Sequence, residues 1–124
     1  MGPTFLLAEA RAIVTRSNSA TTGVWPRAAT YLMRQALEMA LDEYWQRGDM
    51  AVATLTECSM ETQMACLPEF MEPALARQAA YVWTALSGAC HFHPYEHGPT
   101  AEELDRWLDD VSAFIEATAS AIPT

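Results

Sequence analysis

The side chains best suited to chemistry are concentrated in one short segment, residues 90–97, which reads CHFHPYEH. All three histidines of the chain lie there, together with Cys90, Tyr95 and Glu96. Imidazole and thiolate groups can bind zinc, and imidazole also transfers protons near neutral pH. The segment therefore allows three interpretations: a metal site, an acid/base site, or a helix end rich in imidazoles.

The spacing within this segment argues against a metal site. No familiar zinc-ligand spacing is present, and Pro94 separates His93 from His97, so these two do not form a pair one helical turn apart. The only distant thiols, Cys58 and Cys66, are themselves too far apart for a Cys-x-x-Cys motif. We therefore predict no bound metal and no other cofactor. Near a helix end, histidines can instead bond the free carbonyl groups of the last turn.

Helical spacing places a second set of small polar residues around His91. Thr84, Ser87 or Gly88, and His91 follow one another at three- or four-residue spacing, so they share one face of a helix. Small residues on this face would allow another helix, or a second copy of the chain, to approach closely. Glu38 on an earlier helix could accept a hydrogen bond from the imidazole and fix its tautomer. The alternative interpretation is a structural hydrogen bond from His91 at a helix–helix or dimer contact.

The length and composition of the chain fit one domain spanning residues 1–124. Hydrophobic residues make up 51% of the sequence, which is enough for a real core. The apolar runs are far shorter than the roughly 20 residues needed to cross a bilayer, and the N-terminus has the pattern of a helix, not of a signal peptide. The three cysteines, an odd number, then indicate reduced thiols and a cytoplasmic location.

The charge balance argues against a broad nucleic-acid-binding face. The formal net charge is −9, and the seven basic residues are all arginines. Binding along DNA requires clustered cations, and the acidic residues near the end of the chain would repel a polyanion. We therefore expect neither DNA nor a membrane as a partner, although a local arginine site is compatible with this charge.

Glycine and proline residues divide the chain into about five helices. Apolar residues recur at helical spacing, and no stretch alternates with the period of a β-strand. Thr100 as N-cap, with Glu103 three residues later, predicts a capping box on the last helix. The fold class is therefore all-α, an antiparallel bundle of about five helices. The predicted helices cover approximately residues 4–17, 25–48, 49–67, 73–92 and 101–118.

Three of these helices have clearly predicted faces. The second is apolar almost all round, which is typical of a central helix or of one that also serves a dimer interface. The core stripe of the fourth helix is predicted to contain Leu75, Ala79, Val82, Leu86 and Cys90. The apolar face of the last helix is predicted to contain Leu104, Trp107, Leu108, Val111, Phe114, Ile115 and Thr118.

Two segments resemble parts of HEPN domains, which are small helical bundles. WPRAATYLMRQALEMALDEYW is similar to their early long helix, which often carries an Ala/Gln-Ala-Leu-Glu core like RQALEMAL here. LSGACHFHPYEHGPTAEELDRWLDDVSAFIEA is similar to the end of such a bundle, where a helix with the functional motif is followed by a short turn and a closing amphipathic helix. The resemblance runs from about Ala8 to Ala117 and implies an HEPN-like fold.

The resemblance also implies a functional motif on the fourth helix. HEPN proteins are often metal-independent ribonucleases that act as toxins or defence effectors, with the active site at a dimer interface. Their motif is an arginine followed, after about four to six residues, by a histidine, which matches His91 or His93 here. The arginine is not matched: the segment TALSG places Thr84 or Leu86 at its position, and Ser87 at the polar position of the motif.

The missing arginine matters because metal-free RNA cleavage needs a base, an acid and a cation near the phosphorus. Histidine can transfer the protons, whereas arginine supplies a permanent charge that fits phosphate oxygens. In a dimer, an arginine from elsewhere, Arg34 or Arg77, could replace it.

The favoured interpretation is a homodimeric HEPN-like interaction module of the RNA-processing or toxin/defence type, with lost or altered ribonuclease activity. One alternative is an active metal-independent endoribonuclease that uses His91. Another is a helical protein that binds a small molecule or a nucleotide. The partners considered besides a second copy are RNA or a nucleotide ligand, a nucleotidyltransferase and an antitoxin. The candidate catalytic residues are His91, His93, Ser87 and Glu38, and the candidate binding residues are Arg34, Thr84 and Tyr95.

Overall fold

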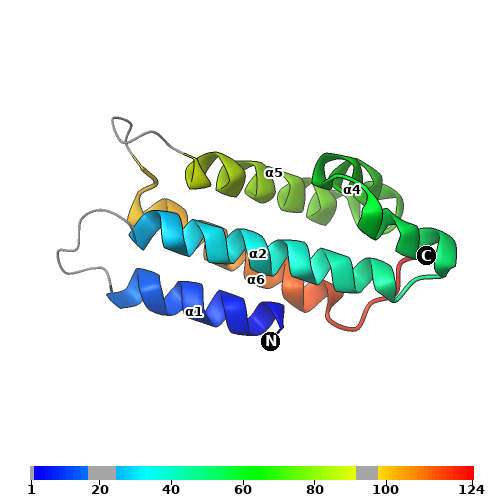
Figure 1. The fold of residues 1–124 in the computed structure, drawn as a ribbon, viewed down its shortest axis with the longest axis horizontal. Coiled ribbons are helices and arrows are strands. Elements are labelled where there is room, and N and C mark those ends of the chain that lie inside the picture. The colour runs from blue at the N-terminus through cyan, green and yellow to red at the C-terminus, as the bar shows by residue number, and fades with distance from the viewer. Residues whose placement is uncertain (1, 17–24, 92–97) are drawn as a thin grey trace.

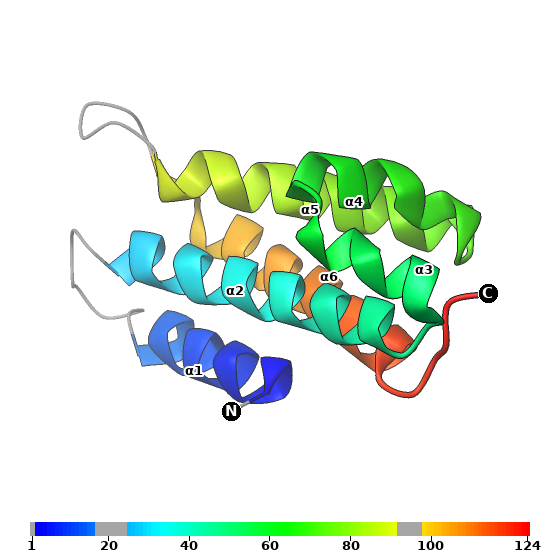
Figure 2. The same ribbon diagram turned by 45° about the vertical axis from the view of Figure 1, so that its right-hand side comes forward.

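The computed structural model of the chain describes residues 2–16, 25–91 and 98–124, and within these ranges it contains helices and no strand. The prediction of an all-α fold is confirmed. The long helices form a bundle (Figures 1 and 2). They are α1 (Pro3–Arg16), α2 (Trp25–Gln46), α5 (Pro73–Cys90) and α6 (Ala101–Thr118).

Helix α2 occupies the centre of the bundle and packs against α1, α5 and α6. This arrangement explains why its sequence is apolar almost all round. Each of its core residues is at most 4% exposed, so the wide apolar surface is used within one copy of the chain. These residues are Ala29, Met33, Ala36, Leu37, Ala40, Leu41, Tyr44 and Trp45.

The core faces of α5 and α6 follow the predicted helical periodicity. All seven predicted core residues of α6 are buried, and the predicted capping box is present at its start. There, the Glu103 backbone N–H donates to Thr100 Oγ1 at 3.1 Å, and the Thr100 backbone N–H donates to Glu103 Oε1 at 2.9 Å. On α5 the predicted stripe is also buried, except that Leu75 is half-buried.

The predicted single helix over residues 49–67 is wrong, because this connector between α2 and α5 is a series of short helical segments. The chain is extended at Cys58, and Ser59 begins a new helix by accepting a hydrogen bond from the Thr62 backbone N–H. Threonine and serine favour such caps and turns over helix interiors, which explains the break. The segments are α3 (Met50–Ala53), η2 (Thr54–Glu57), α4 (Met60–Cys66) and η3 (Leu67–Glu69).

Buried polar contacts attach this connector to α2. Trp45 Nε1 donates to Gln63 Oε1 at 3.1 Å, and Gln63 Nε2 donates to the Cys58 carbonyl at 2.8 Å. The Tyr44 hydroxyl donates to the Phe70 carbonyl at 3.0 Å. Burial raises the pKa of the Tyr44 phenol, and the nearby charge of Arg47 partly opposes that rise. These bonds hold the connector at one end of the bundle.

At the same end of the bundle, Arg47 links the end of α2 to the end of α6. Its guanidinium donates from Nε to the Ala121 carbonyl at 2.8 Å and from Nη2 to the Thr118 carbonyl. The last carbonyls of a helix have no partner within the helix, so a cation at this position satisfies them and suits the helix dipole.

Among the described residues, none of the helices combines the length and the hydrophobicity of a membrane-spanning segment.

Candidate functional site

His91 lies at the end of α5, where the helix stops two residues earlier than predicted. Its backbone N–H donates to the Gly88 carbonyl at 3.1 Å, and its side chain is exposed. Cys90, just before it, is buried, and its thiol lies 3.7 Å from Thr30 Oγ1 on α2. Cys90 is therefore a core residue. The predicted roles of His93 and Tyr95, like the placement of His97 and Glu96, lie outside the described residues.

One face of α5 is open to solvent along its whole length. Arg77, Tyr81, Thr84, Gly88 and His91 follow one another at three- or four-residue spacing, and all five are exposed. Tyr81 is 66% exposed. A Cβ atom added at Gly88 would meet none of the described residues within 4 Å. The structure thus brings Thr84, Gly88 and His91 together on one exposed face.

The seam between α2 and α5 has a fixed antiparallel register. Thr30 faces Cys90, and two turns further along, Glu38 accepts a hydrogen bond from Trp83 Nε1 at 2.9 Å. Glu38 lies eight residues after Thr30 on α2, which corresponds to about 12 Å along the helix axis. The structure therefore does not bring Glu38 to His91 within one copy of the chain; the carboxylate is bonded to an indole. The indole N–H of a half-buried tryptophan needs a hydrogen-bond acceptor. This requirement is the sequence feature that could have predicted the Glu38–Trp83 contact.

Arg34 and Ser87 lie between these two contacts, at the same level of the seam. Arg34 Nε is 3.6 Å from Glu38 Oε2, and the arginine side chain is 24% exposed. Arg34 Nε and Ser87 Oγ are both shielded from solvent, and neither has a hydrogen-bond partner within the described part of the chain. Ser87 Oγ is thus shielded and is not presented on the exposed face of α5. The charge of Arg34 is partly neutralised by Glu38 and does not lie on the face that presents His91.

A groove of about 390 Å³ runs between α5 and α6, beside the exposed face of α5. It connects the predicted functional helix to the start of α6. Small side chains predominate on the α5 side, and a glutamate and a tryptophan contribute from α6. The lining residues are Tyr81, Thr84, Ala85, Gly88, Ala89, Gly98, Pro99, Glu103 and Trp107.

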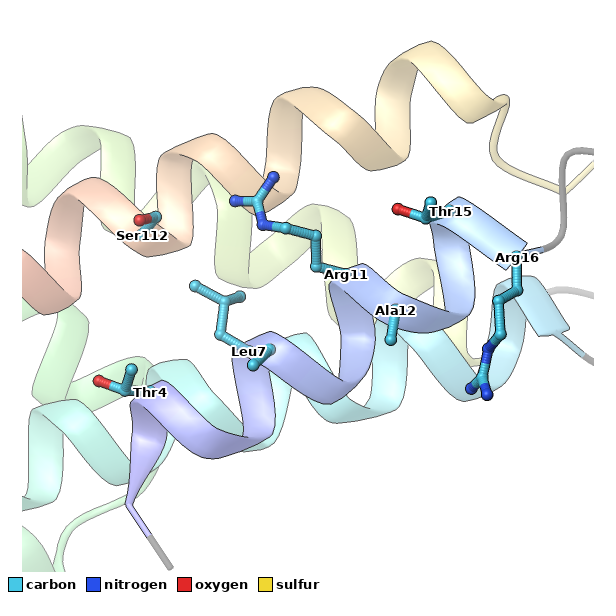
Figure 3. Close-up of a pocket in the computed structure, with 8 residues that line it drawn as sticks. Thr4, Leu7, Arg11, Ala12, Thr15, Arg16 and Ser112 are labelled. Carbon is cyan, nitrogen blue, oxygen red and sulfur yellow. The ribbon is translucent and has the colours of Figure 1, made fainter.

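A second groove, of about 570 Å³, lies between α1 and α6 (Figure 3). Arg11, Thr15 and Ser112 are turned toward it, whereas Arg16 points away from α6. Arg11 forms a 3.8 Å ion pair with Asp109, but both side chains are well exposed, so the pair contributes little to stability. This groove has neither a histidine nor a cysteine in its lining. The α5 side of the bundle is the better candidate for a functional surface.

Among the described residues, no three His, Cys, Asp or Glu side chains are placed to hold a metal ion. Most of the CHFHPYEH segment lies outside those residues, so the prediction of no metal stays a prediction. All three cysteines are free: Cys58 is exposed, Cys66 is half-buried and Cys90 is buried.

The comparisons with known proteins do not assign the chain to a family. Neither family models, nor curated proteins, nor solved structures give a match to this sequence or fold, so the resemblance to HEPN domains depends on the motifs in the sequence itself.

Proposed function

We propose that the chain is an HEPN-like helical bundle that acts as a homodimeric interaction module of the RNA-processing or toxin/defence type, without ribonuclease activity. The observation that carries this proposal is the open face of α5, which presents His91 and a bare Gly88 but no cation at the motif position. The proposal includes a cytoplasmic location, in keeping with the three free thiols.

The surroundings of His91 favour interaction over catalysis. RNA cleavage without a metal needs a cation that stabilises charge on the phosphoryl oxygens as well as groups that transfer protons. At the two candidate motif positions, Leu86 is fully buried in the core, and the Thr84 hydroxyl donates to the Ala80 carbonyl at 2.9 Å. Arg34 is paired with Glu38 in the α2–α5 seam. Arg77 is exposed on the same face of α5, but it lies 14 residues, or about 21 Å along the helix, before His91. Within one copy of the chain, proton transfer by the histidine would thus lack its electrostatic partner.

The exposed face of α5 has features of a surface that another helix covers. Glycine within a helix costs about 1 kcal/mol relative to alanine. No neighbour within the described structure requires a glycine at position 88, because a Cβ there would point into open space. A partner that approaches α5 closely would explain the glycine. The exposed Tyr81 and the adjacent groove give such a partner an apolar surface to contact.

We expect the purified protein to leave total RNA intact in the presence of excess chelator. The His91→Ala variant, incubated in parallel, should give the same gel profile, because His91 alone cannot stabilise the charged transition state. Cleavage by the native protein that disappears in the His91→Ala variant would show an active ribonuclease and overturn this part of the proposal. Arg34→Ala and Arg77→Ala variants would then show which of the two arginines supplies the cation.

We also expect a dimer in solution. Light scattering at micromolar concentration should give about twice the 13.7 kDa mass of one chain. A mass that stays near 13.7 kDa across a concentration series would contradict the proposed homodimer. This measurement is independent of the RNA experiment, so the two parts of the proposal can fail separately.

A further inference from the structure

We infer that the groove between α1 and α2 is a docking site for a basic, amphipathic helical segment of another protein. The groove has a volume of about 610 Å³ and is lined by Leu6, Gln35, Glu38, Met39 and Asp42. Helices α1 and α5 lie on different sides of α2 (Figures 1 and 2). The groove is therefore distinct from the α5 face of the proposed homodimer, and the inference adds a second surface together with the chemistry of its partner.

The apolar part of the groove fits the buried side of an amphipathic helix. Leu6 on α1 and Met39 on α2 are both half-buried in its lining. Tyr31 is 48% exposed, and its hydroxyl accepts a hydrogen bond from Gln35 Nε2 at 3.1 Å. From Tyr31 to Asp42 this face covers three turns of α2, or about 16 Å. An amphipathic helix binds such a groove through apolar side chains three, four and seven residues apart.

The two carboxylates of the groove are held in place by hydrogen bonds. Glu38 Oε2 accepts from Trp83 Nε1 at 2.9 Å and lies 3.6 Å from Arg34 Nε. Asp42 Oδ2 accepts from Gln46 Nε2 at 2.6 Å. Among the described residues, neither Glu38 Oε1 nor Asp42 Oδ1 has a hydrogen-bond donor. Because the two side chains are four residues apart on one face, lysine or arginine of a bound segment can pair with both.

The charge around the groove favours a basic partner over a second copy of the chain. Glu9, one turn from Leu6, and Glu43, one turn from Met39, are exposed. Neither glutamate has an ion pair within the described ranges. Glu43 lies in the last turn of α2, directly after Asp42, where the helix dipole disfavours negative charge. The stability of α2 therefore does not explain these acids. A second copy, with its own net charge of −9, would be repelled by them.

A pair of designed peptides tests the chemistry of the partner. The probe is an amphipathic helix of leucine and lysine, about 18 residues long, and its control has the same leucines with glutamate in place of lysine. Fluorescence anisotropy at low salt should give a micromolar dissociation constant for the lysine peptide, and added salt should weaken its binding. The glutamate peptide should bind at least about tenfold more weakly. Equal binding of the two peptides, or no binding of the lysine peptide at millimolar protein, overturns the inference.

Variants in the groove test where the lysine peptide binds. Asp42→Arg should weaken binding about tenfold more than Asp105→Arg, which makes the same change in net charge at an exposed position of α6. Met39→Gln should weaken binding about threefold, whereas Met50→Gln, at an 88% exposed position of the connector, should leave it unchanged. Circular dichroism verifies that each variant is folded. Equal responses within either pair place the peptide elsewhere and overturn the inference.

NMR of the methionine methyl groups gives a second measurement, on the native protein. The lysine peptide should shift the Met39 signal and leave the Met50 signal in place; an unchanged Met39 signal at saturation contradicts docking in this groove.

Sedimentation of Asp42→Arg separates this inference from the proposed homodimer. The dissociation constant of its dimer should stay within about threefold of the native value, because the groove lies away from α5. A dimer weakened about tenfold or more would place the second copy in the groove and overturn the docking inference. A native protein that is monomeric at all concentrations but binds the lysine peptide at Met39 overturns the homodimer alone.

Discussion

Replacement of Trp45 by alanine is expected to lower the free energy of unfolding by about 3–5 kcal/mol. Trp45 is fully buried at the place where α2 meets the connector. Its ring lies 5.4 Å from that of Tyr44 and 5.2 Å from that of Phe70, the latter in an edge-to-face arrangement. Alanine would leave a cavity among these rings, and it would also remove the hydrogen bond to Gln63.

Urea denaturation followed by far-UV circular dichroism, at one fixed protein concentration, measures this loss. Fixed concentration matters because dimerisation adds to apparent stability. The matched variant Trp45→Phe keeps most of the ring volume but leaves the buried Gln63 Oε1 without its donor, so a loss of about 1–3 kcal/mol is expected. Combining it with Gln63→Leu should cost less than the sum of the two single variants. A loss below about 1 kcal/mol for Trp45→Ala would contradict the described packing.

The parts of the fold that the sequence predicted correctly depend on local rules. The seven core residues of α6 recur at helical spacing, and its capping box needs only Thr100 and Glu103 in the first turn. The core stripe of α5 follows the same period. In each case the information lies within about four turns of one helix, so no knowledge of neighbouring elements was required.

The connector was predicted poorly because its structure depends on contacts with another helix. Periodicity alone joined residues 49–67 into one helix, whereas Gln63 reaches back to the Cys58 carbonyl and across to Trp45 on α2. These partners satisfy the buried polar groups at the break after Cys58. Helix propensity indicates that break only weakly. Contacts of this kind link positions far apart in the chain and have no signature in a short window.

In the candidate site, too, the sequence predicted which residues share a face of one helix but not the contacts between two helices. Helical spacing placed Thr84, Gly88 and His91 on one face of α5, and the structure brings them together there. The expected approach of Glu38 to His91 failed because it required the register between α2 and α5. That register is set by the Glu38–Trp83 and Thr30–Cys90 contacts, which join residues 45 and 60 positions apart. It also places Arg34 level with Ser87, a juxtaposition that sequence spacing could not predict.

The largest functional effect is expected from substitutions at Gly88. Gly88→Trp should weaken the dimer by about 100-fold or more, because a bulky side chain would block the close approach of the partner subunit proposed at Gly88, at both symmetric positions. The isolated fold should tolerate the change, since a Cβ at this position meets none of the described residues within 4 Å. Gly88→Ala should act in two directions: it should stabilise the monomer by about 0.5–1 kcal/mol through helix propensity and weaken association only modestly.

Comparison of these two variants separates a role in association from a role in folding. Ala12→Trp provides the matched control, because it adds an indole at an exposed position of α1, away from the proposed interface. Sedimentation should then show a dimer for the native protein and for Ala12→Trp, and a folded monomer for Gly88→Trp. If Gly88→Trp dimerises as tightly as the native chain, α5 is not the interface. If it unfolds while Gly88→Ala also loses stability, the glycine is required by the fold of the single chain, and the argument from its open surroundings is wrong.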